Sequence, residues 1–375
     1  MKKYIQNSLI VIVSILFTLS MSELVYRILV YKSFLINPEV TTSHHKTFCE
    51  YDPLLGWRHK KNIAVRFVTN EYDALLEFNS KGLRGPEIAC EKDSDVYRVL
   101  ILGDSFAEGY TVNFEDSFPE ILREKLAGKI KDKTVEVINA GVGGYSTDQE
   151  YLFMAEEGRK FRPDLTVIMF CENDVYYNAQ PEYWRGLKPC FALENEALVL
   201  KNSPVPGPPV ELKQNSIVGF LKRSYLLSHL AGRLRNKVNR ELPADQRVRL
   251  IKYGPEIENG WLITEKILQK FKLLADSWKG SVLVVYIPPA DMVYDKLYEA
   301  YINSYDNIDG KIDIRKPAAI LRNICSGNEI NFLDLTDELR LQGKGRRLYY
   351  KWDGHWNKEG HKVVGQVLAE YIRIK

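Results

Sequence analysis

The chain has 375 residues, of which 45% are hydrophobic and 27% are charged. This length and balance are typical of a globular protein with one large core plus additions, and they exclude a largely disordered, collagenous or polytopic membrane protein. The 52 Lys and Arg residues and 49 Asp and Glu residues leave a formal charge of +3, so nucleic acid is not an expected partner. The 5 cysteines include no CxxC pair, which argues against a zinc ribbon or a redox dithiol.

The N-terminal segment, residues 1–33, has the pattern of an export signal or a membrane anchor. Lys2 and Lys3 precede an uncharged and mostly apolar run over residues 8–21, and the apolar pattern resumes beyond Glu23. Because no small-x-small cleavage site follows the run, we expect an uncleaved, single-pass signal anchor that leaves the rest of the chain on the non-cytoplasmic side. The alternatives are secretion after cleavage of the signal and a buried helix of a soluble protein.

Residues 34–95 are expected to form a small β-rich lead-in, because residues 64–68 and 74–78 flank a turn-prone segment and predict a hairpin. From residue 96 the pattern changes to apolar, β-branched runs separated by helical stretches. This alternation is typical of an α/β domain whose parallel sheet is covered by helices, here over residues 96–375. The predicted strands are residues 96–102, 135–139, 165–170, 281–287 and 330–334, with helices near residues 118–127 and 148–160.

An insertion of roughly 80 residues, about 176–256, separates the third and fourth predicted strands and is too long for a simple crossover. It contains a Pro-rich stretch at residues 203–209 and a basic amphipathic segment at residues 220–240. The basic segment predicts either a substrate lid or membrane-contacting helix, or a solvated helix packed on the domain.

Ser105 is the candidate nucleophile. It follows the first predicted strand in the sequence Gly103-Asp104-Ser105, and α/β sheets carry their active sites at the carboxyl ends of parallel strands. The segment matches neither the GxGxxG nor the GxxxxGKS/T phosphate-binding motif, and it is not a GxSxG elbow. Taken alone, it could equally be a strand-end turn in which Asp104 caps backbone amides.

Two further strand ends supply candidate donors for an oxyanion. Gly144 follows the second predicted strand, and Asn173 follows the third. A backbone N–H at an open glycine and a side-chain amide are the donors that a tetrahedral oxyanion needs. Each residue alone could be a turn or a polar cap, but their coincidence with Ser105 at one sheet edge favours a catalytic site.

His355 is the candidate base, since it lies in a predicted loop before the last helix with Asp353 close enough to orient its ring. His361, on the early turns of that helix, is the fallback base. A metal site is a weaker alternative because no HExxH or similar ligand spacing is present. No metal or organic cofactor is expected.

These four segments, in this order, resemble those of the SGNH (GDSL-type) hydrolase family. In that family the active site combines the serine of Gly-Asp-Ser, a glycine after the second strand, an asparagine after the third and a C-terminal Asp/His pair. The matching positions here are Ser105, Gly144, Asn173, Asp353 and His355. The resemblance covers roughly residues 96–375 and implies a flavodoxin-like three-layer α/β/α sandwich and serine ester chemistry.

Two positions depart from the family's pattern. Cys171 stands where the third block usually has glycine, and it could tighten the approach to the oxyanion pocket. Only one residue separates Asp353 from His355, where two are common. This shorter form resembles that of the alginate O-acetyltransferase branch, whose members act on exported polysaccharide.

We therefore hypothesise a serine esterase or deacetylase that acts on acyl esters, chiefly O-acetyl esters, with an acetylated glycan as one candidate substrate. Ser105 would attack the carbonyl, His355 would activate it, and Asp353 would orient His355. The N–H groups of Ser105 and Gly144 and the Asn173 amide would stabilise the oxyanion. The alternatives are an O-acyltransferase that modifies exported or cell-envelope polysaccharide, and a non-catalytic glycan-binding or assembly protein.

Overall fold

The computed structural model describes residues 2–31, 47–69, 71–207, 241–306, 308 and 310–374, and its contacts divide the chain into two units. The first comprises residues 1–44, 68–70 and 209–241, and the second comprises residues 45–67, 71–208 and 242–375. The basic segment predicted at residues 220–240 lies outside the described residues. The second unit contains the central sheet and the candidate site.

Helix α1 (Lys2–Tyr31) accounts for most of the described part of the first unit. Its stretch Gln6–Tyr26 has a mean hydropathy of 2.1. This stretch is long and apolar enough to cross a membrane, a property that membrane anchors share with signal sequences.

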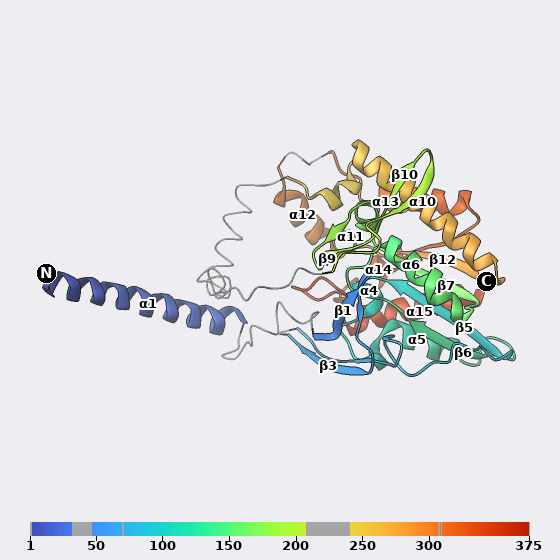
Figure 1. Cartoon of the computed structure of the whole chain (residues 1–375), viewed down its shortest axis with the longest axis horizontal. Helices are drawn as coiled ribbons and strands as arrows, with labels where there is room; N and C mark the ends of the chain where they lie inside the picture. Colours follow the sequence, from blue (N-terminus) through green and yellow to red (C-terminus); the bar gives the residue numbers. More distant parts are fainter. Residues whose placement is uncertain are drawn as a thin grey trace. The chain divides into compact units, whose positions relative to one another are not determined.

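The second unit is built on a five-stranded parallel sheet with the order β13-β12-β7-β5-β6 (Figure 1). The strands are β5 (Val96–Gly103), β6 (Thr134–Asn139), β7 (Leu165–Phe170), β12 (Ser281–Tyr286) and β13 (Asn331–Asp334). All the predicted strands are confirmed, with ends that differ by at most a residue. Strand β7 is buried at every position, as expected for a strand covered on both faces.

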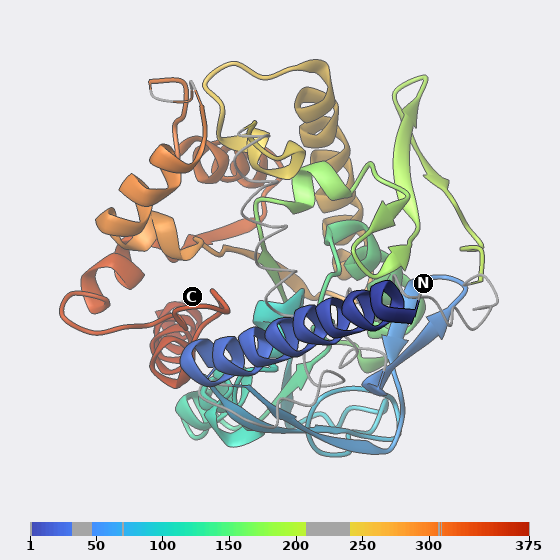
Figure 2. The same cartoon turned by 90° about the vertical axis from the view of Figure 1, so that its left-hand side faces the viewer.

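Helices cover both faces of this sheet, because successive side chains of a strand point to opposite sides and give each face its own core. One face packs against α6 (Thr147–Glu156), α10 (Pro255–Asp276) and α13 (Lys316–Gly327). The other packs against α5 (Phe118–Leu126), α14 (Thr336–Gln342) and α15 (Lys358–Ile374), with α5 beside α15 (Figure 2). The three-layer α/β/α prediction is confirmed.

The β-rich lead-in forms two small sheets, β1 (Cys49–Asp52) with β2 (Gly56–His59) and β3 (Ile63–Val68) with β4 (Asp73–Phe78). The β3–β4 hairpin was expected, whereas the shorter β1–β2 pair was not. A separate aromatic core forms here from Phe48, Phe67, Tyr72, Leu76, Phe78 and Tyr110. Because Tyr110 belongs to the segment that follows β5, this core joins the lead-in to the carboxyl edge of the sheet.

The described part of the insertion builds short elements beside that edge. They are α7 (Asp174–Tyr177), β8 (Glu182–Tyr183), β9 (Gly186–Leu187), β10 (Cys190–Glu194), β11 (Ala197–Lys201) and the 3-10 helix η3 (Ala244–Arg249). The β10–β11 hairpin projects from the body of the unit in Figure 2.

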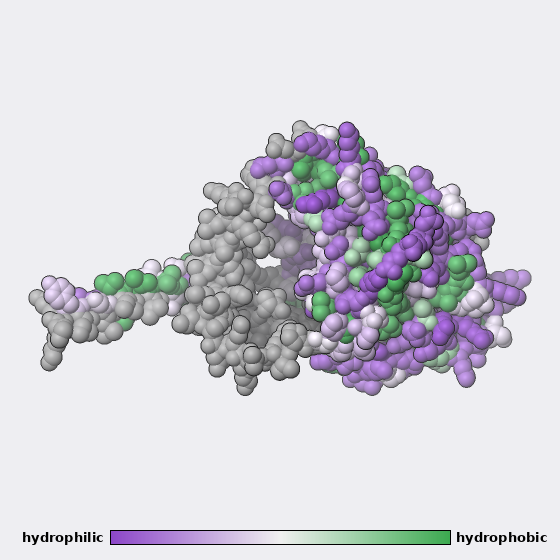
Figure 3. Space-filling view, turned by 45° about the horizontal axis from the view of Figure 1, so that its top comes forward, coloured by the Kyte–Doolittle hydropathy of each residue, from purple (hydrophilic) through white to green (hydrophobic). Residues whose placement is uncertain are grey.

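The remaining elements are the short helices α4 (Ser105–Glu108), η1 (Phe114–Asp116), η2 (Gly158–Phe161), α11 (Ala290–Val293) and α12 (Asp295–Ser304). Hydrophilic side chains cover most of the described surface seen in Figure 3. All five cysteines are free.

Candidate active site

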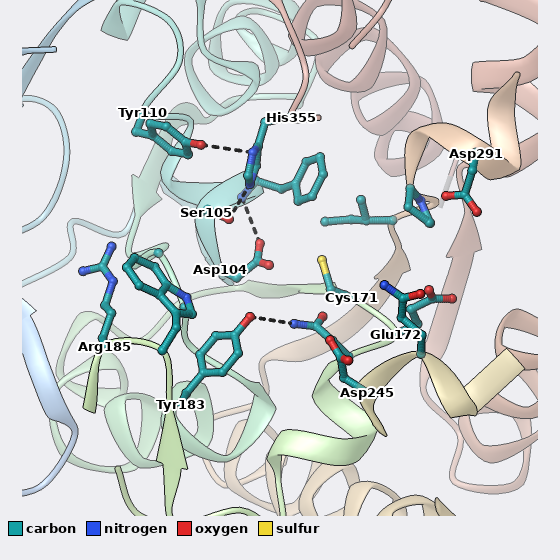
Figure 4. A pocket seen from close by; sticks show the side chains of 18 of the residues that line it. Asp104, Ser105, Tyr110, Cys171, Glu172, Tyr183, Arg185, Asp245, Asp291 and His355 are labelled. Atoms are coloured by element: carbon teal, nitrogen blue, oxygen red, sulfur yellow. Dashed lines mark hydrogen bonds between the residues drawn. The ribbon is translucent and has the colours of Figure 1, made fainter. Parts of the chain in front are cut away.

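The carboxyl ends of β5, β6 and β7 are neighbours, because β5 lies between the other two in the sheet. The loops that follow them therefore meet at one edge and line a pocket of ≈ 450 Å³ (Figure 4). Ser105, Gly144, Asn173 and His355 all line this pocket. Asp353 lies behind His355, on the side of the ring away from Ser105.

The turn that presents Ser105 depends on a tight approach at Gly103. Its φ is +153°, and a Cβ at this position would lie 2.7 Å from the Cβ of Ala107 and 2.8 Å from that of Met169. Asp104 then caps helix α4 by accepting the Phe106 N–H at 2.8 Å. A capping role for Asp104 and a nucleophile role for Ser105 are thus compatible, since the cap places Ser105 in the open first turn of the helix.

The serine, histidine and aspartate form a continuous hydrogen-bonded chain. Ser105 Oγ lies 2.7 Å from His355 Nε2, and His355 Nδ1 lies 2.6 Å from Asp353 Oδ1. A carboxylate accepts from Nδ1–H, which leaves Nε2 free to accept the serine proton. Gly354, with a φ of +83°, makes the turn that brings the two loop residues together.

Electrostatics support the same protonation states. Burial alone would raise the pKa of Asp353, but hydrogen bonds from His355, Tyr110 and Tyr72 hold it below its ordinary value. Burial alone would lower the pKa of His355, but the Asp353 hydrogen bond and charge, together with the charge of Asp104, raise it above 6.5. The pair therefore combines a carboxylate whose ionised form is favoured with a histidine whose protonated form that carboxylate stabilises.

The oxyanion candidates face the same pocket. Gly144 has a φ of +80°, and its N–H has no hydrogen-bond partner among the described residues. The preceding residue is held on both sides, because Gly143 N–H donates to Glu108 Oε2 at 3.0 Å and the Gly143 carbonyl accepts from Trp57 Nε1 at 3.1 Å. The Asn173 amide lies 3.4 Å from the Tyr183 hydroxyl, at the pocket wall.

His361 lies outside this arrangement. It is buried at the start of α15, where Nδ1 accepts the Phe118 N–H at 3.3 Å and the ring stacks on that of Phe118. Burial lowers the pKa of His361 to about 3, so it is held neutral as part of the core. Cys171, the substitution for glycine, is buried and lines the pocket beside Asp104.

The opposite wall comes mainly from the insertion and was largely missed by sequence reasoning. Arg249 of η3 is ion-paired with Glu172 at 2.6 Å and with Asp291, and its guanidinium lies 4.6 Å from the Tyr301 ring centroid. Asp245 lines the same wall. No sequence pattern placed η3 beside β7.

A third wall is formed by Tyr183, Trp184 and Arg185. Trp184 is 58% exposed although it lines the pocket, and the Arg185 guanidinium lies 4.7 Å from its ring centroid. Among the residues that the structure describes, no group of three or more His, Cys, Asp or Glu side chains could hold a metal ion.

Residues 101–248 match the model of the GDSL-like Lipase/Acylhydrolase family. The fold is that of the SGNH hydrolases. The matched range contains Ser105, Gly144 and Asn173, whereas Asp353 and His355 lie beyond it. Over this range, which is less than half of the chain, the sequence is similar to a family of ester-hydrolysing enzymes.

Several solved structures are similar, including two esterases. The acetyl xylan esterase AlAXEase is 16% identical with a TM-score of 0.41, and the alignment covers 73% of this chain and 99% of that chain. An acetylxylan esterase from Geobacillus stearothermophilus, solved as a catalytic mutant, is 12% identical with a TM-score of 0.41, covering 75% of this chain and 96% of that chain.

A member of the lipolytic protein G-D-S-L family from Veillonella parvula is 13% identical with a TM-score of 0.38, covering 73% of this chain and 97% of that chain. No curated protein matches the sequence. Because these TM-scores and identities are low, we base the functional proposal on the geometry of the site and on the family match.

Proposed function

We propose that this protein is a serine esterase that cleaves acyl esters through an acyl-enzyme intermediate on Ser105. The observation that carries the proposal is the unbroken chain of short hydrogen bonds from Ser105 through His355 to Asp353, at one edge of an open pocket. A serine hydroxyl is a weak nucleophile unless a base removes its proton as it attacks, and this chain supplies the base and its orienting group.

In the acylation step, Ser105 Oγ bonds to the ester carbonyl carbon while its proton passes to His355 Nε2. The carbonyl oxygen becomes an oxyanion that accepts from the N–H groups of Ser105 and Gly144 and from the Asn173 amide. The C–O bond to the leaving alcohol then breaks, and His355 returns the proton to that alcohol. In deacylation, water gives a proton to His355 Nε2 as its oxygen attacks the carbonyl carbon of the acyl-serine. The bond from that carbon to Ser105 Oγ then breaks, His355 returns the proton to Oγ, and the carboxylic acid leaves.

The wall formed by Tyr183, Trp184 and Arg185 favours an acylated carbohydrate as the substrate. The indole of Trp184 exposes apolar surface to water beside the pocket, and a sugar ring could cover that surface. The guanidinium of Arg185 and the carboxylate of Asp245 line the same pocket and can bind sugar hydroxyls. Cys171 and Phe106 line the same pocket as Ser105, and their bulk there favours a small acyl group such as acetyl. An O-acetylated glycan combines both features.

A glycan hydroxyl could also replace water as the acyl acceptor, which would make the protein an O-acyltransferase for exported or cell-envelope polysaccharide. Both reactions need the same serine, base and oxyanion donors, and they differ only in which nucleophile reaches the acyl-enzyme. We favour hydrolysis, because the matched family is described as lipases and acylhydrolases.

We further propose that α1 anchors the enzyme in a membrane with the catalytic unit on the non-cytoplasmic side. The apolar stretch Gln6–Tyr26 follows Lys2 and Lys3, and positive charge is retained preferentially on the cytoplasmic side. Mass spectrometry of the N-terminus of the mature protein would show whether the segment is cleaved, and protease protection in spheroplasts would show its orientation.

The direct test is release of p-nitrophenol from p-nitrophenyl acetate by the full chain in mild detergent. We expect Ser105→Ala and His355→Ala each to lower kcat by about 10³-fold or more, with circular dichroism unchanged. The same assay with an added oligosaccharide, read by mass spectrometry, reports acyl transfer as acetyl on the sugar. Folded protein that neither turns over acyl esters nor reacts at Ser105 with a phosphonate would instead support the non-catalytic binding protein.

A further inference from the structure

The carboxylate of Asp353 has more partners than the triad requires. Tyr110 Oη lies 3.0 Å from Oδ1 and 2.9 Å from Oδ2, and Tyr72 Oη donates to Oδ2 at 2.9 Å. With His355 Nδ1 at 2.6 Å from Oδ1, both oxygens are held. A carboxylate fixed at both oxygens cannot rotate about its last bond without losing a hydrogen bond.

The two tyrosines are themselves rigidly placed. Both are buried in the aromatic core of the lead-in, where the Phe67 ring stacks on Tyr72 at 5.7 Å and meets Tyr110 edge-on at 5.5 Å. Burial and the negative charge of Asp353 raise the pKa of Tyr110, so its hydroxyl stays protonated and can donate. The Tyr110 hydroxyl also lies 3.0 Å from His355 Nδ1.

The residue before Tyr72 holds the backbone of the same loop. The Glu71 carboxylate accepts the N–H groups of Lys351 at 2.7 Å, Trp352 at 2.9 Å and Asp353 at 2.8 Å. The turn between β3 and β4 in the lead-in thus binds Asp353 twice: Glu71 accepts its backbone N–H, and Tyr72 donates to its carboxylate. This turn lies outside residues 101–248, the range that matches the acylhydrolase family.

We propose that Tyr72 and Tyr110 are positioning residues that hold the Asp353 carboxylate toward His355, and that the lead-in is therefore a working part of the active site. The proposal rests on the proposed function, since it assigns the tyrosines to the base of that triad. Neither hydroxyl takes part in bond making. They act by fixing the orientation of the carboxylate and by stabilising its negative charge through hydrogen bonds.

The charge sharing gives the proposal a signature that simple packing lacks. Hydrogen bonds from the phenols withdraw negative charge from Asp353, so their removal leaves more charge facing the imidazole of His355. The other titratable groups that act on this ring are Asp104 at the end of β5 and His361 on α15, and neither contacts the phenols in the described hydrogen bonds. Loss of a phenol should thus raise the pKa of His355 further above 6.5.

The experiment compares Tyr72→Phe, Tyr110→Phe and the double variant with the full-length wild type. Tyr350→Phe is the matched control, because its ring lies 5.1 Å from that of Tyr72 while its hydroxyl donates to Thr111 O and not to Asp353. The readouts are kcat and KM on p-nitrophenyl acetate across pH, and titration of the His355 imidazole by NMR of histidine-labelled protein. The NMR titration needs no substrate and assigns the signal by its loss in His355→Gln.

We expect Tyr72→Phe to lower kcat about tenfold with KM unchanged, and the double variant to lower it further. In Tyr72→Phe and in the double variant, the acid limb of kcat/KM and the His355 titration should move to higher pH. With a higher pKa, His355 becomes the neutral base only at a higher pH. The proposal is overturned if the His355 titration does not move in either variant, or if Tyr350→Phe moves it equally. A wild type without turnover would count against the esterase while the titration still decided the positioning role.

Discussion

The two sides of the pocket differ in how firmly hydrogen bonds hold the side chains that we propose for the reaction and those proposed to contact substrate. On the catalytic side, Asp353 and His355 are hydrogen-bonded to protein groups at every position that orients them. On the opposite side, Trp184 of the insertion is 58% exposed, and the buried hydroxyl of Tyr301 on α12 has no hydrogen-bond partner among the described residues. The reacting groups are thus fixed before substrate arrives, whereas the opposite wall has groups left for a ligand to cover or bind.

This difference predicts that equivalent changes on the two sides have very different effects. Asp353→Asn should lower kcat by about 10³-fold, because an amide facing Nδ1 favours the wrong histidine tautomer. Asp245→Asn removes a carboxylate from the opposite wall, and we expect a change in kcat of about threefold or less with p-nitrophenyl acetate. Steady-state kinetics of both variants tests this prediction. Similar losses in kcat would show that the carboxylates on the two sides of the pocket are equally important for the reaction.

The catalytic side was accessible to sequence reasoning because its residues follow strands with strong patterns. Buried parallel strands read as continuous apolar runs, so their ends were located closely, and Ser105, Gly144 and Asn173 each follow such an end. The structure brings these residues together with His355 in one pocket. Their catalytic roles remain a proposal until the variants are measured.

The supporting groups could not be predicted in the same way. Tyr72 and Glu71 lie in a turn whose partners are far along the chain, and no local period indicates which loop they contact. His59 sits among basic residues in the sequence, yet it is buried with its Nε2 2.7 Å from Glu108 Oε1, which in turn holds Gly143. Tertiary pairing of this kind depends on how the lead-in packs, which the sequence pattern does not specify.

The insertion wall gives a second, smaller prediction. Trp184→Ala should raise KM for an acetylated oligosaccharide about fivefold with kcat nearly unchanged, because the indole contributes stacking that is similar in the ground and transition states. Trp352→Ala is the matched control, since Trp352 is also exposed, at 78%, but does not line the pocket. If p-nitrophenyl acetate shows the same rise in KM as the oligosaccharide, Trp184 shapes the pocket and does not bind the sugar.

The smallest effect contrasts His355 in the pocket with His361 in the core. The pKa of His361 is lowered by burial from 6.5 to about 3, so between these values the unfolded chain binds a proton that the folded chain excludes. Its contribution to stability is therefore full above pH 6.5 and is lost as the pH falls toward 3. His355 has the opposite sign: its folded pKa lies above 6.5, so its contribution is full below pH 6.5 and is lost as the pH rises through the folded value.

Urea unfolding at a series of pH values separates the two. His361→Gln should flatten the fall in the free energy of unfolding on the acid side of pH 6.5, whereas His355→Gln should leave that fall in place and alter only the side above it. Since the His355 side chain is 23% exposed, solvent screening makes its effect the weaker one. An acid-side slope that His361→Gln leaves unchanged would mean that the ring is protonated in the folded protein, and that the start of α15 is less tightly packed than its contacts with Phe118 indicate.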